Sequence, residues 1–431
     1  MDILVQHGSI LVILAAVVGF FMAWGIGAND VANAMGTSVG SKALTIKQAI
    51  IIAMVFEFAG AYLAGGEVTS TIRKGIIDPS FFVEIPELLV FGMISALFAA
   101  ATWLLVASVL GWPVSTTHSI VGAIIGFAAV GISPDTVAWG KVGGIVGSWI
   151  ITPLISGVIA FIIFNSAQKL IFDTEKPLDQ AKRYVPFYMF LAGFVLSLVT
   201  IKKGLKHIGL ENVNLGFYNF EIKGAGGYYL AVLVAVIVAL IGKYFITKLK
   251  FDDKADMKSQ YGNVEKVFAI LMIVTACCMA FAHGSNDVAN AIGPLAAVVS
   301  IVDNGGEIAK KASLVWWILP LGGLGIVAGL ALFGHRVIAT IGNGITHLTP
   351  SRGFAAELAA ACTVVISSGA GLPISTTQTL VGAVLGVGMA RGIAAINLGV
   401  VRNIVISWVI TLPVGAGLSI VFFWIMKAIF T

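Results

Sequence analysis

Apolar runs of about twenty residues recur from one end of this chain to the other, and each is long enough to cross a bilayer as a helix. Of the 431 residues, 58% are hydrophobic and only 11% are charged, and the mean hydropathy is +0.99. Ordinary soluble domains do not have this composition. The runs are continuous rather than alternating, which argues against a transmembrane β-barrel. The sequence therefore predicts an all-α polytopic membrane protein.

About twelve membrane segments are expected among thirteen apolar stretches, given the length that a helical crossing requires. Their approximate bounds are 3–24, 48–66, 88–110, 114–130, 143–164, 186–200, 228–247, 264–282, 287–301, 314–334, 355–370, 375–390 and 400–428. The short segments 114–130, 287–301 and 375–390 begin at polar or Pro-containing breaks, so we expect broken half-helices or arms of re-entrant hairpins there. Residues 3–24 lack a basic start and a small-residue cleavage site, so we expect a retained helix rather than a secretory signal.

The chain repeats itself, because three signatures occur twice in the same order. A polar motif, Gly-(Ala/Ser)-Asn-Asp-Val-Ala-Asn-Ala, stands at 27–34 and again at 284–291. A Pro-x-Ser-Thr-Thr stretch and then a Ser-Trp-x-Ile-Thr stretch follow each copy. This order predicts an internal duplication. The expected divisions are a first repeat at 1–164, two linking helices with polar loops at 165–263, and a second repeat at 264–431.

The two repeats are expected to have opposite orientations in the membrane. An odd number of crossings precedes the second repeat, whether 88–110 and 114–130 both cross or form a re-entrant hairpin. Inverted repeats are typical of secondary transporters, which bind their substrates near the midplane. Lys and Arg in the loops 165–185 and 243–266 favour a cytoplasmic location for both, with both termini outside, whereas the basic loop 201–227 favours the reverse.

Several other classes of protein are disfavoured. The net charge of +5 is carried by loops and sets orientation, so no nucleic-acid partner is expected. Cys277, Cys278 and Cys362 lie in apolar runs without the spacing of a metal site. The chain has no P-loop, dinucleotide fingerprint or nucleophile elbow, so we expect neither an ATP-driven pump nor an enzyme, and no cofactor.

The polar motifs place Asn29, Asp30 and Asn33 inside an apolar run. A charge at the bilayer centre costs about 2.5–3.5 kcal/mol on insertion scales, so it normally has a partner or lines a cavity. Gly25 and Gly27 would permit an unwound turn that frees backbone carbonyls. Carboxylate, amide and carbonyl oxygens suit an alkali cation. Polar contacts between helices are the alternative, but the second copy, with Asn286, Asp287 and Asn290, favours cation or substrate binding.

The Ser-Thr-Thr stretches 115–117 and 375–377 each follow a proline and open an apolar helical run. A helix N-terminus presents free N–H groups and a positive dipole end, which together bind anions. Ordinary helix capping is the alternative. Two copies near broken helices favour binding of a small oxyanion. Because no Lys or Arg lies in the apolar cores near the motifs, cations at the Asn-Asp sites would supply the positive charge, which couples the two ligands.

Four further residues are candidates for coupling or gating. Glu57 and Glu357 are acids in apolar runs and could be cation ligands, proton carriers or partners of buried hydroxyls. His283 precedes the second motif, and His118 closes the first Ser-Thr-Thr stretch where the second copy has Gln378. Both histidines could equally be structural. The Gly-x-x-x-Gly pairs at 122–126 and 382–386 predict tight helix packing, within the chain or in a dimer.

Taken together, the paired Asn-Asp motifs and Pro-x-Ser-Thr-Thr stretches resemble the inorganic phosphate transporter (PiT) family of secondary transporters, over both halves of the chain. The resemblance implies a homodimeric phosphate symporter with inverted repeats and re-entrant hairpins. The phosphate site that it implies consists of Ser115, Thr116, Thr117, Ser375, Thr376, Thr377, Asp30 and Asp287. The sodium ligands that we expect are Asn29, Asp30, Asn33, Asn286, Asp287, Asn290 and Glu57. Family members couple to sodium or to protons, and some relatives carry sulfate.

We therefore expect a sodium-coupled importer of inorganic phosphate in the plasma membrane, with sodium as co-substrate and alternating access. A proton-coupled phosphate, metal-phosphate or sulfate permease is the first alternative, and it would need Glu57 and His118. A passive anion channel or a membrane scaffold is the second. Paired acids near the midplane speak against both, because neither a channel nor a scaffold needs them.

Overall fold

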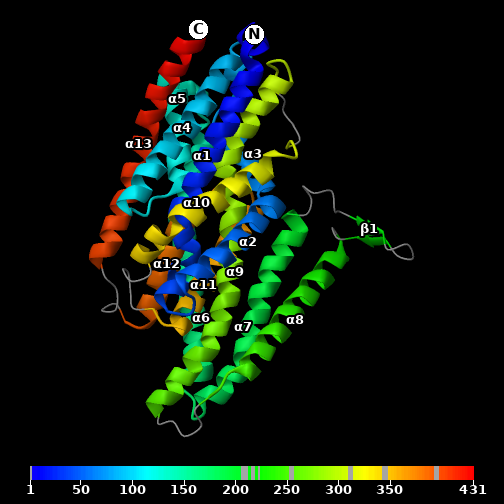
Figure 1. The fold of residues 1–431 in the computed structure, drawn as a ribbon, viewed down its shortest axis with the longest axis vertical. Helices are drawn as coiled ribbons and strands as arrows, with labels where there is room; N and C mark the ends of the chain where they lie inside the picture. The colour runs from blue at the N-terminus through cyan, green and yellow to red at the C-terminus, as the bar shows by residue number, and fades with distance from the viewer. Residues whose placement is uncertain are drawn as a thin grey trace.

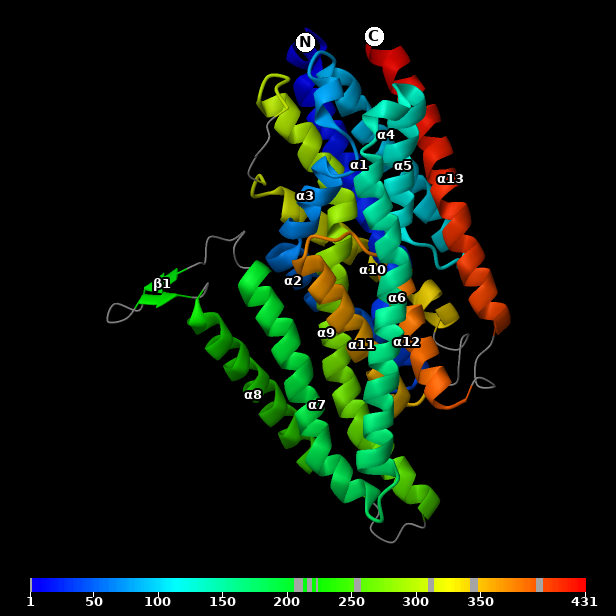
Figure 2. The same cartoon turned by 180° about the vertical axis from the view of Figure 1, so that it is seen from behind.

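The computed structural model describes residues 2–204, 212–214, 219–221, 224–251, 257–308, 314–341, 348–392 and 398–431. These residues form a helical bundle (Figures 1 and 2). The helices are α1 (Asp2–Gly40), α2 (Ile46–Ala64), α3 (Gly66–Lys74), α4 (Pro86–Leu110), α5 (Thr116–Gly131), α6 (Trp139–Ala167), α7 (Pro177–Val199), α8 (Ala225–Lys248), α9 (Met257–Asp303), α10 (Ile318–Ile341), α11 (Pro350–Gly369), α12 (Thr376–Ala390) and α13 (Leu398–Phe430). The predicted all-α membrane fold is confirmed.

One small β-hairpin was not expected from the sequence. The strands β1 (Asn212–Asn214) and β2 (Asn219–Glu221) pair antiparallel, with Val213 opposite Phe220. They lie in the basic loop between α7 and α8, at the outer edge of the molecule (Figure 1). Much of that loop, including Lys206 and Lys223, lies outside the described residues.

Nine helices in the described part of the chain are long and apolar enough to cross a membrane, and α5 and α12 are shorter apolar helices. Many large hydrophobic side chains on the outside of the bundle are exposed, among them Ile150 and Leu154 of α6 and Leu240 of α8. An outer surface of this kind suits contact with lipid, and the protein is a multi-pass membrane protein.

The long helices α1 and α9 correct the expected segment boundaries. Residues 264–282 and 287–301 were expected as two segments separated by a polar break, but both belong to the single helix α9. In the same way α1 continues through residues 27–34 to Gly40. The polar motifs therefore lie within unbroken helices, while the predicted short helices after Pro113 and Pro373 are confirmed as α5 and α12.

The helices α1 and α9 lie side by side in the centre and run in opposite directions, with both chain termini at one end (Figure 1). The connection of α4 to α5 and that of α11 to α12 form two helical hairpins beside this pair. The last helix of each half packs on the short helix of the other half, α13 on α5 and α6 on α12 (Figure 2). The pair α7–α8 stands at the periphery.

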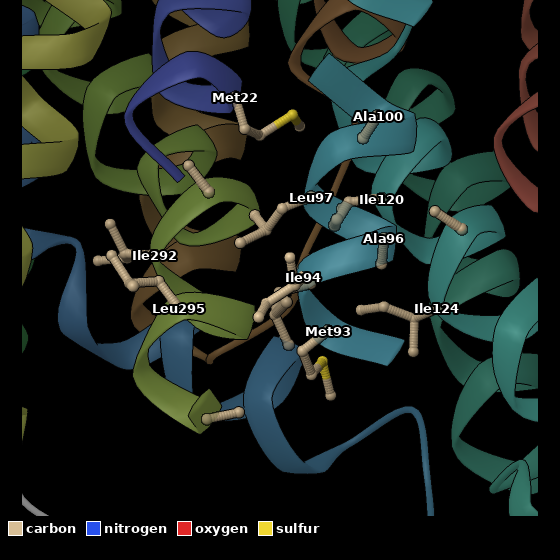
Figure 3. Packing of buried hydrophobic residues seen from close by; sticks show 14 of the residues in the cluster. Met22, Met93, Ile94, Ala96, Leu97, Ala100, Ile120, Ile124, Ile292 and Leu295 are labelled. Atoms are coloured by element: carbon tan, nitrogen blue, oxygen red, sulfur yellow. The ribbon is translucent and has the colours of Figure 1, made fainter. Parts of the chain in front are cut away.

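Buried apolar side chains fix the first hairpin against the central pair. Figure 3 shows Met22 of α1, Leu97 of α4, Ile120 of α5 and Leu295 of α9 converging in one cluster. All four side chains are excluded from solvent. Helices in lipid associate by close van der Waals packing of this kind rather than by exclusion of water, so this part of the molecule is a well-packed support for the polar groups next to it.

Two glycines allow the short helices to approach their partners closely. A Cβ on Gly122 of α5 would lie 2.5 Å from the carbonyl oxygen of Leu412 in α13. A Cβ on Gly382 of α12 would lie 2.2 Å from the carbonyl oxygen of Pro153 in α6. Both distances are shorter than van der Waals contact. The Gly-x-x-x-Gly pairs thus serve packing within the chain, between the two halves.

Candidate functional site

The two polar motifs face the centre of the bundle from α1 and α9, and they are helical throughout. The unwound turn expected near Gly27 is absent from the described helix α1, so that expectation was wrong. The glycines serve helix crossing instead. A Cβ on Gly27 would lie 1.9 Å from the carbonyl oxygen of Ile326, and one on Gly284 would lie 2.2 Å from that of Glu57. Each motif therefore packs closely against a helix of the opposite half.

Two hairpin tips, residues 111–115 and 371–375, lead into α5 and α12 beside the motifs. Gly111 and Gly371 have φ angles of 69° and 73°, in the left-handed region that ends α4 and α11. Ser115 then caps α5 by accepting a bond from the backbone N–H of His118 at 3.3 Å. Ser375 caps α12 in the same way from Gln378 N at 3.3 Å. The predicted helix starts are confirmed, and each leaves first-turn N–H groups available.

The first asparagine of each motif binds the hairpin tip of its own half. Asn29 Nδ2 donates to the carbonyl oxygen of Trp112 at 3.0 Å, and Asn29 Oδ1 accepts from the N–H of Val114 at 3.2 Å. The amide of Asn286 contacts the Ser368 hydroxyl at the end of α11 at 2.9 Å and the carbonyl oxygen of Leu372 in the tip at 3.4 Å. Asn29 and Asn286 therefore position the tips, a role that the sequence reasoning missed because it assigned both amides to sodium.

The second asparagine of each motif reaches the Thr pair of the opposite half. Asn33 Nδ2 donates to Thr377 Oγ1 at 2.8 Å. Asn290 Nδ2 donates to Thr117 Oγ1 at 3.1 Å and lies 3.3 Å from Thr116 Oγ1. The predicted motifs are thus brought together in a crossed arrangement, in which α1 contacts α12 and α9 contacts α5.

The tips also contact each other across the centre of the molecule. Thr117 Oγ1 donates to the carbonyl oxygen of Ile374 at 2.9 Å, and Thr377 Oγ1 donates to that of Val114 at 3.4 Å. Each tip is therefore held by a Thr of the other half. Movement of one hairpin relative to the other must break or exchange these two bonds.

Two aspartates lie in this crossed arrangement, and each is almost completely excluded from solvent. Thr376 Oγ1 donates to Asp287 Oδ2 at 2.8 Å. For Asp30, no donor in the described part of the chain meets hydrogen-bond geometry with either oxygen, although the Thr116 hydroxyl faces it. A buried carboxylate without hydrogen bonds is costly unless a ligand or a proton completes it.

His283 distinguishes the second half of the site from the first. Its Nε2 lies 3.1 Å from Asp287 Oδ2 and its Nδ1 lies 3.2 Å from Glu57 Oε1, with all three side chains buried. These are ion-pair distances, and neither contact of the imidazole has hydrogen-bond geometry. The residue one position before the first motif is Ile26, and the first half therefore has no equivalent of His283.

The donor atoms suit a bound cation. Ligand atoms of Asp30, His283 and Asp287 lie within 4.8 Å of one another. The two unpartnered oxygens of Asp30 and the neighbouring Thr hydroxyls are hard oxygen donors, which suit an alkali ion. The Thr116 and Thr376 hydroxyls and the starts of α5 and α12 lie next to the same acids, so that an anion and cations can bind in contact with each other.

Glu357 lies in a separate polar pocket between α1, α9 and α11. Its Oε1 accepts from Thr37 Oγ1 at 2.5 Å and from Ser38 Oγ at 2.6 Å, and its Oε2 accepts from Thr275 Oγ1 at 2.8 Å. Among the three alternatives left open for this acid, the structure places it with buried hydroxyl partners. The three hydroxyl residues were missed, although the Thr-Ser pair directly after the first motif was a visible signal.

His118 also lies outside the acid cluster. Its Nδ1 is 3.3 Å from the carbonyl oxygen of Trp408, and its ring packs on Trp149 with centroids 3.8 Å apart. Gln378 stands at the equivalent position of α12 and is also buried. His118 therefore contacts the Ser-Trp segments of α6 and α13.

A narrow cleft of about 10 Å³, enough for about one water molecule, lies beside α3. It is lined by residues of α2, α3, α9 and α11, among them Ala64, Glu67, Ser285 and Ser368. Ser368 is the residue that contacts Asn286. Thr71 of α3 donates to the carbonyl oxygen of Gly371 at 2.7 Å, so α3 rests on the second hairpin tip beside this cleft.

A buried acid pair faced by two helix starts, inside a bundle of membrane-spanning helices, defines the protein as a polytopic membrane transporter and not an enzyme. Comparison with known proteins agrees with this class. The model of the phosphate transporter family matches residues 26–419. The chain belongs to this family and is a phosphate transporter.

The relatives match over almost the whole length of the chain. A protein of Haemophilus influenzae named "Putative phosphate permease" is 59% identical, with all of both chains covered. The Arabidopsis thaliana protein "Inorganic phosphate transporter 2-1, chloroplastic" is 44% identical over 95% of this chain and 71% of its own length. The solved structure "The sodium-dependent phosphate transporter" has 41% identity and a TM-score of 0.87, covering 97% of this chain and 99% of the other.

Proposed function

We propose that the protein is a sodium-coupled symporter that carries inorganic phosphate into the cell by alternating access. One observation carries the proposal. Asp30 is buried, and the Thr116 hydroxyl and the Asp287 carboxyl face it without meeting hydrogen-bond geometry, while the starts of two helices stand next to this acid pair. The acid needs a cation and the helix starts favour an anion, so each ligand stabilises the other.

The charge balance explains why coupling is needed. Phosphate is an anion, and the site itself already holds the carboxylates of Asp30, Asp287 and Glu57 against one imidazole, that of His283. Adding phosphate to this set without further cations would place like charges in a medium of low dielectric. Sodium ions at the oxygen atoms of Asp30, Asn33, Asp287 and Asn290 would offset that repulsion. The solved relative is named as sodium-dependent, which supports this choice of cation.

The crossed arrangement supports the proposal of inverted repeats and alternating access. The helices α1 and α9, which carry the two copies of the motif, run in opposite directions (Figure 1). Each half supplies one acid, one hairpin tip and one helix that packs on the opposite hairpin. Two related halves with opposite orientation can exchange their conformations, which would open the same site to either side of the membrane.

Uptake of labelled phosphate into proteoliposomes tests the proposal. With sodium outside, uptake should exceed the rate measured with choline at the same ionic strength by at least about tenfold, within the range of typical coupling factors. Liposomes without protein give the background. Equal uptake in sodium and in choline would exclude sodium coupling, and uptake at background under every gradient would exclude phosphate transport by the purified chain.

The proton-coupled alternative is favoured by one contact, the bridge of His283 between Glu57 and Asp287. A buried imidazole between two carboxylates can hold a proton that moves with the substrate. In the same liposomes, uptake driven by an inward proton gradient in the absence of sodium would select this alternative. Inhibition by sulfate at concentrations near that of phosphate would indicate a sulfate permease.

The membrane sidedness and the oligomeric state stay predictions. Both termini lie at one end of the molecule (Figure 1), which agrees with their proposed location on the same, extracytoplasmic side of the plasma membrane. Of the basic loops used for that assignment, several residues lie outside the described part of the chain. The proposed homodimer rests on the family resemblance.

A further inference from the structure

Each half of the chain carries a Ser-Trp pair close to the hairpin tip of the other half. The pairs are Ser148–Trp149 in α6 and Ser407–Trp408 in α13, at the start of the third repeated signature. The two halves use their pair differently. Trp149 Nε1 donates to the carbonyl oxygen of Pro373 at 3.3 Å. Ser407 Oγ lies 3.1 Å from the carbonyl oxygen of Pro113 and 2.7 Å from that of Ile404 in its own helix, so its single proton is shared between the two.

The other residue of each pair, Ser148 in α6 and Trp408 in α13, makes no hydrogen bond to a hairpin tip among the described residues. Ser148 Oγ donates to the carbonyl oxygen of Ile145 in its own helix at 2.6 Å. Trp408 Nε1 is buried and has no hydrogen-bond partner in the described part of the chain. An unpaired buried N–H is costly, and in a native structure it calls for an explanation. A role in a second conformation is such an explanation.

The hydrogen bonds made near the two hairpin tips also differ between the two halves. Thr376 of the second tip bonds Asp287 at 2.8 Å, while Asp30 receives no such bond. Thr117 bonds the Ile374 carbonyl at 2.9 Å, while the matching bond from Thr377 is 3.4 Å long. Corresponding residues of the two repeated halves therefore make different hydrogen bonds.

We propose that Ser148–Trp149 and Ser407–Trp408 form a reciprocal latch that positions the two hairpin tips. In the conformation described here, Trp149 holds Pro373 and Ser407 holds Pro113. In the opposite conformation the halves exchange roles: Trp408 Nε1 binds the Pro113 carbonyl, and Ser148 Oγ binds the Pro373 carbonyl. The latch rests on the proposed alternating access of the two halves.

The latch assigns opposite effects to two matched substitutions. Trp149→Phe removes a bond made in this conformation, so it shifts the population toward the opposite one. Trp408→Phe removes the unpaired N–H of this conformation and the bond of the opposite one, so it shifts the population toward this one. Loss of one buried hydrogen bond corresponds to a shift of about threefold to tenfold in each case.

A reporter cysteine at the half-buried Ala64, on the wall of the cleft beside α3, measures these shifts by its change in accessibility. Ala64→Cys is introduced after Cys277, Cys278 and Cys362 are replaced by Ala, and its rate of reaction with a maleimide is followed in the purified full-length protein. Trp149→Phe should slow the labelling about threefold to tenfold, and Trp408→Phe should leave it as fast or faster. Trp316→Phe, at a position 82% exposed, is the matched control and should not change the rate.

A second pair of variants decides the matter if either Trp variant fails to fold. Ser407→Ala should slow the labelling as Trp149→Phe does, and Ser148→Ala should act as Trp408→Phe does. Shifts in the same direction for both members of a matched pair, or the absence of slowing in both Trp149→Phe and Ser407→Ala, would overturn the latch. Labelling needs neither sodium nor phosphate, so the latch can fail while coupled uptake persists, and uptake can fail while the opposite shifts persist.

Discussion

At the scale of single residues, the buried acids differ in their hydrogen-bond and ion-pair partners. Asp287 has a Thr hydroxyl and an imidazole next to it, whereas Asp30 has neither within bonding geometry in the described structure. Glu357 is different again, because three hydroxyls already satisfy it. The three acids are buried to the same degree. They differ in their partners: the oxygens of Glu357 already accept hydrogen bonds, whereas those of Asp30 are available to a ligand.

Asp30→Asn is predicted to separate stability from function. The substitution keeps the shape of the side chain and removes a buried charge, so the melting temperature of the purified protein should stay the same or rise. Sodium-driven phosphate uptake should fall by roughly 100-fold, because the cation loses its ionised ligand.

The exposed acid Asp135, in the turn before α6, provides the control. Asp135→Asn should change neither the melting temperature nor the uptake. If Asp30→Asn lowered the melting temperature in proportion to the loss of uptake, Asp30 would be a structural acid and not a ligand.

At the scale of helices and hairpins, part of the architecture could be predicted from the sequence. The starts of α5 and α12 were predictable because Pro and Ser at fixed positions specify a helix N-terminus by local geometry alone. The continuity of α1 and α9 could not be predicted in this way. Glycine before a polar motif is equally compatible with an unwound turn and with a close helix crossing, and only the position of Ile326 and Glu57 on the facing helices decides between them.

The candidate site was predictable in its members but not in its contacts. Asn33 and Asn290 resemble Asn29 and Asn286 in sequence, yet they bind opposite halves of the chain. This difference depends on how the repeats cross, which involves residues about 80 to 340 positions apart. The hydroxyl partners of Glu357 were missed for the same reason.

Gly386→Ala is predicted to destabilise the packing of α12 on α6. The added Cβ would lie 2.0 Å from the carbonyl oxygen of Gly157, so the helices must separate, at a cost of about 1–3 kcal/mol. Gly144→Ala in α6 meets no atom within 4 Å and should keep or raise the melting temperature. Equal melting temperatures for the two variants in detergent would contradict the tight contact between α6 and α12.

At the scale of the whole molecule, cation and anion are proposed to stabilise each other in one buried site that the two halves share. The helices that carry the acids cross at the centre, and each hairpin tip is bound by side chains of both halves. A ligand that binds there contacts both halves at once. Under the proposed alternating access, reorientation of the loaded site would be coupled to occupancy, since an incompletely neutralised site resists closure in low dielectric.

The central claim is tested most directly by equilibrium binding of inorganic phosphate to the purified protein in sodium and in choline at the same ionic strength. The account predicts that sodium raises the affinity for phosphate by roughly 5- to 150-fold, and that phosphate raises the affinity for sodium by the same factor. An affinity for phosphate that is equal in sodium and in choline would contradict it.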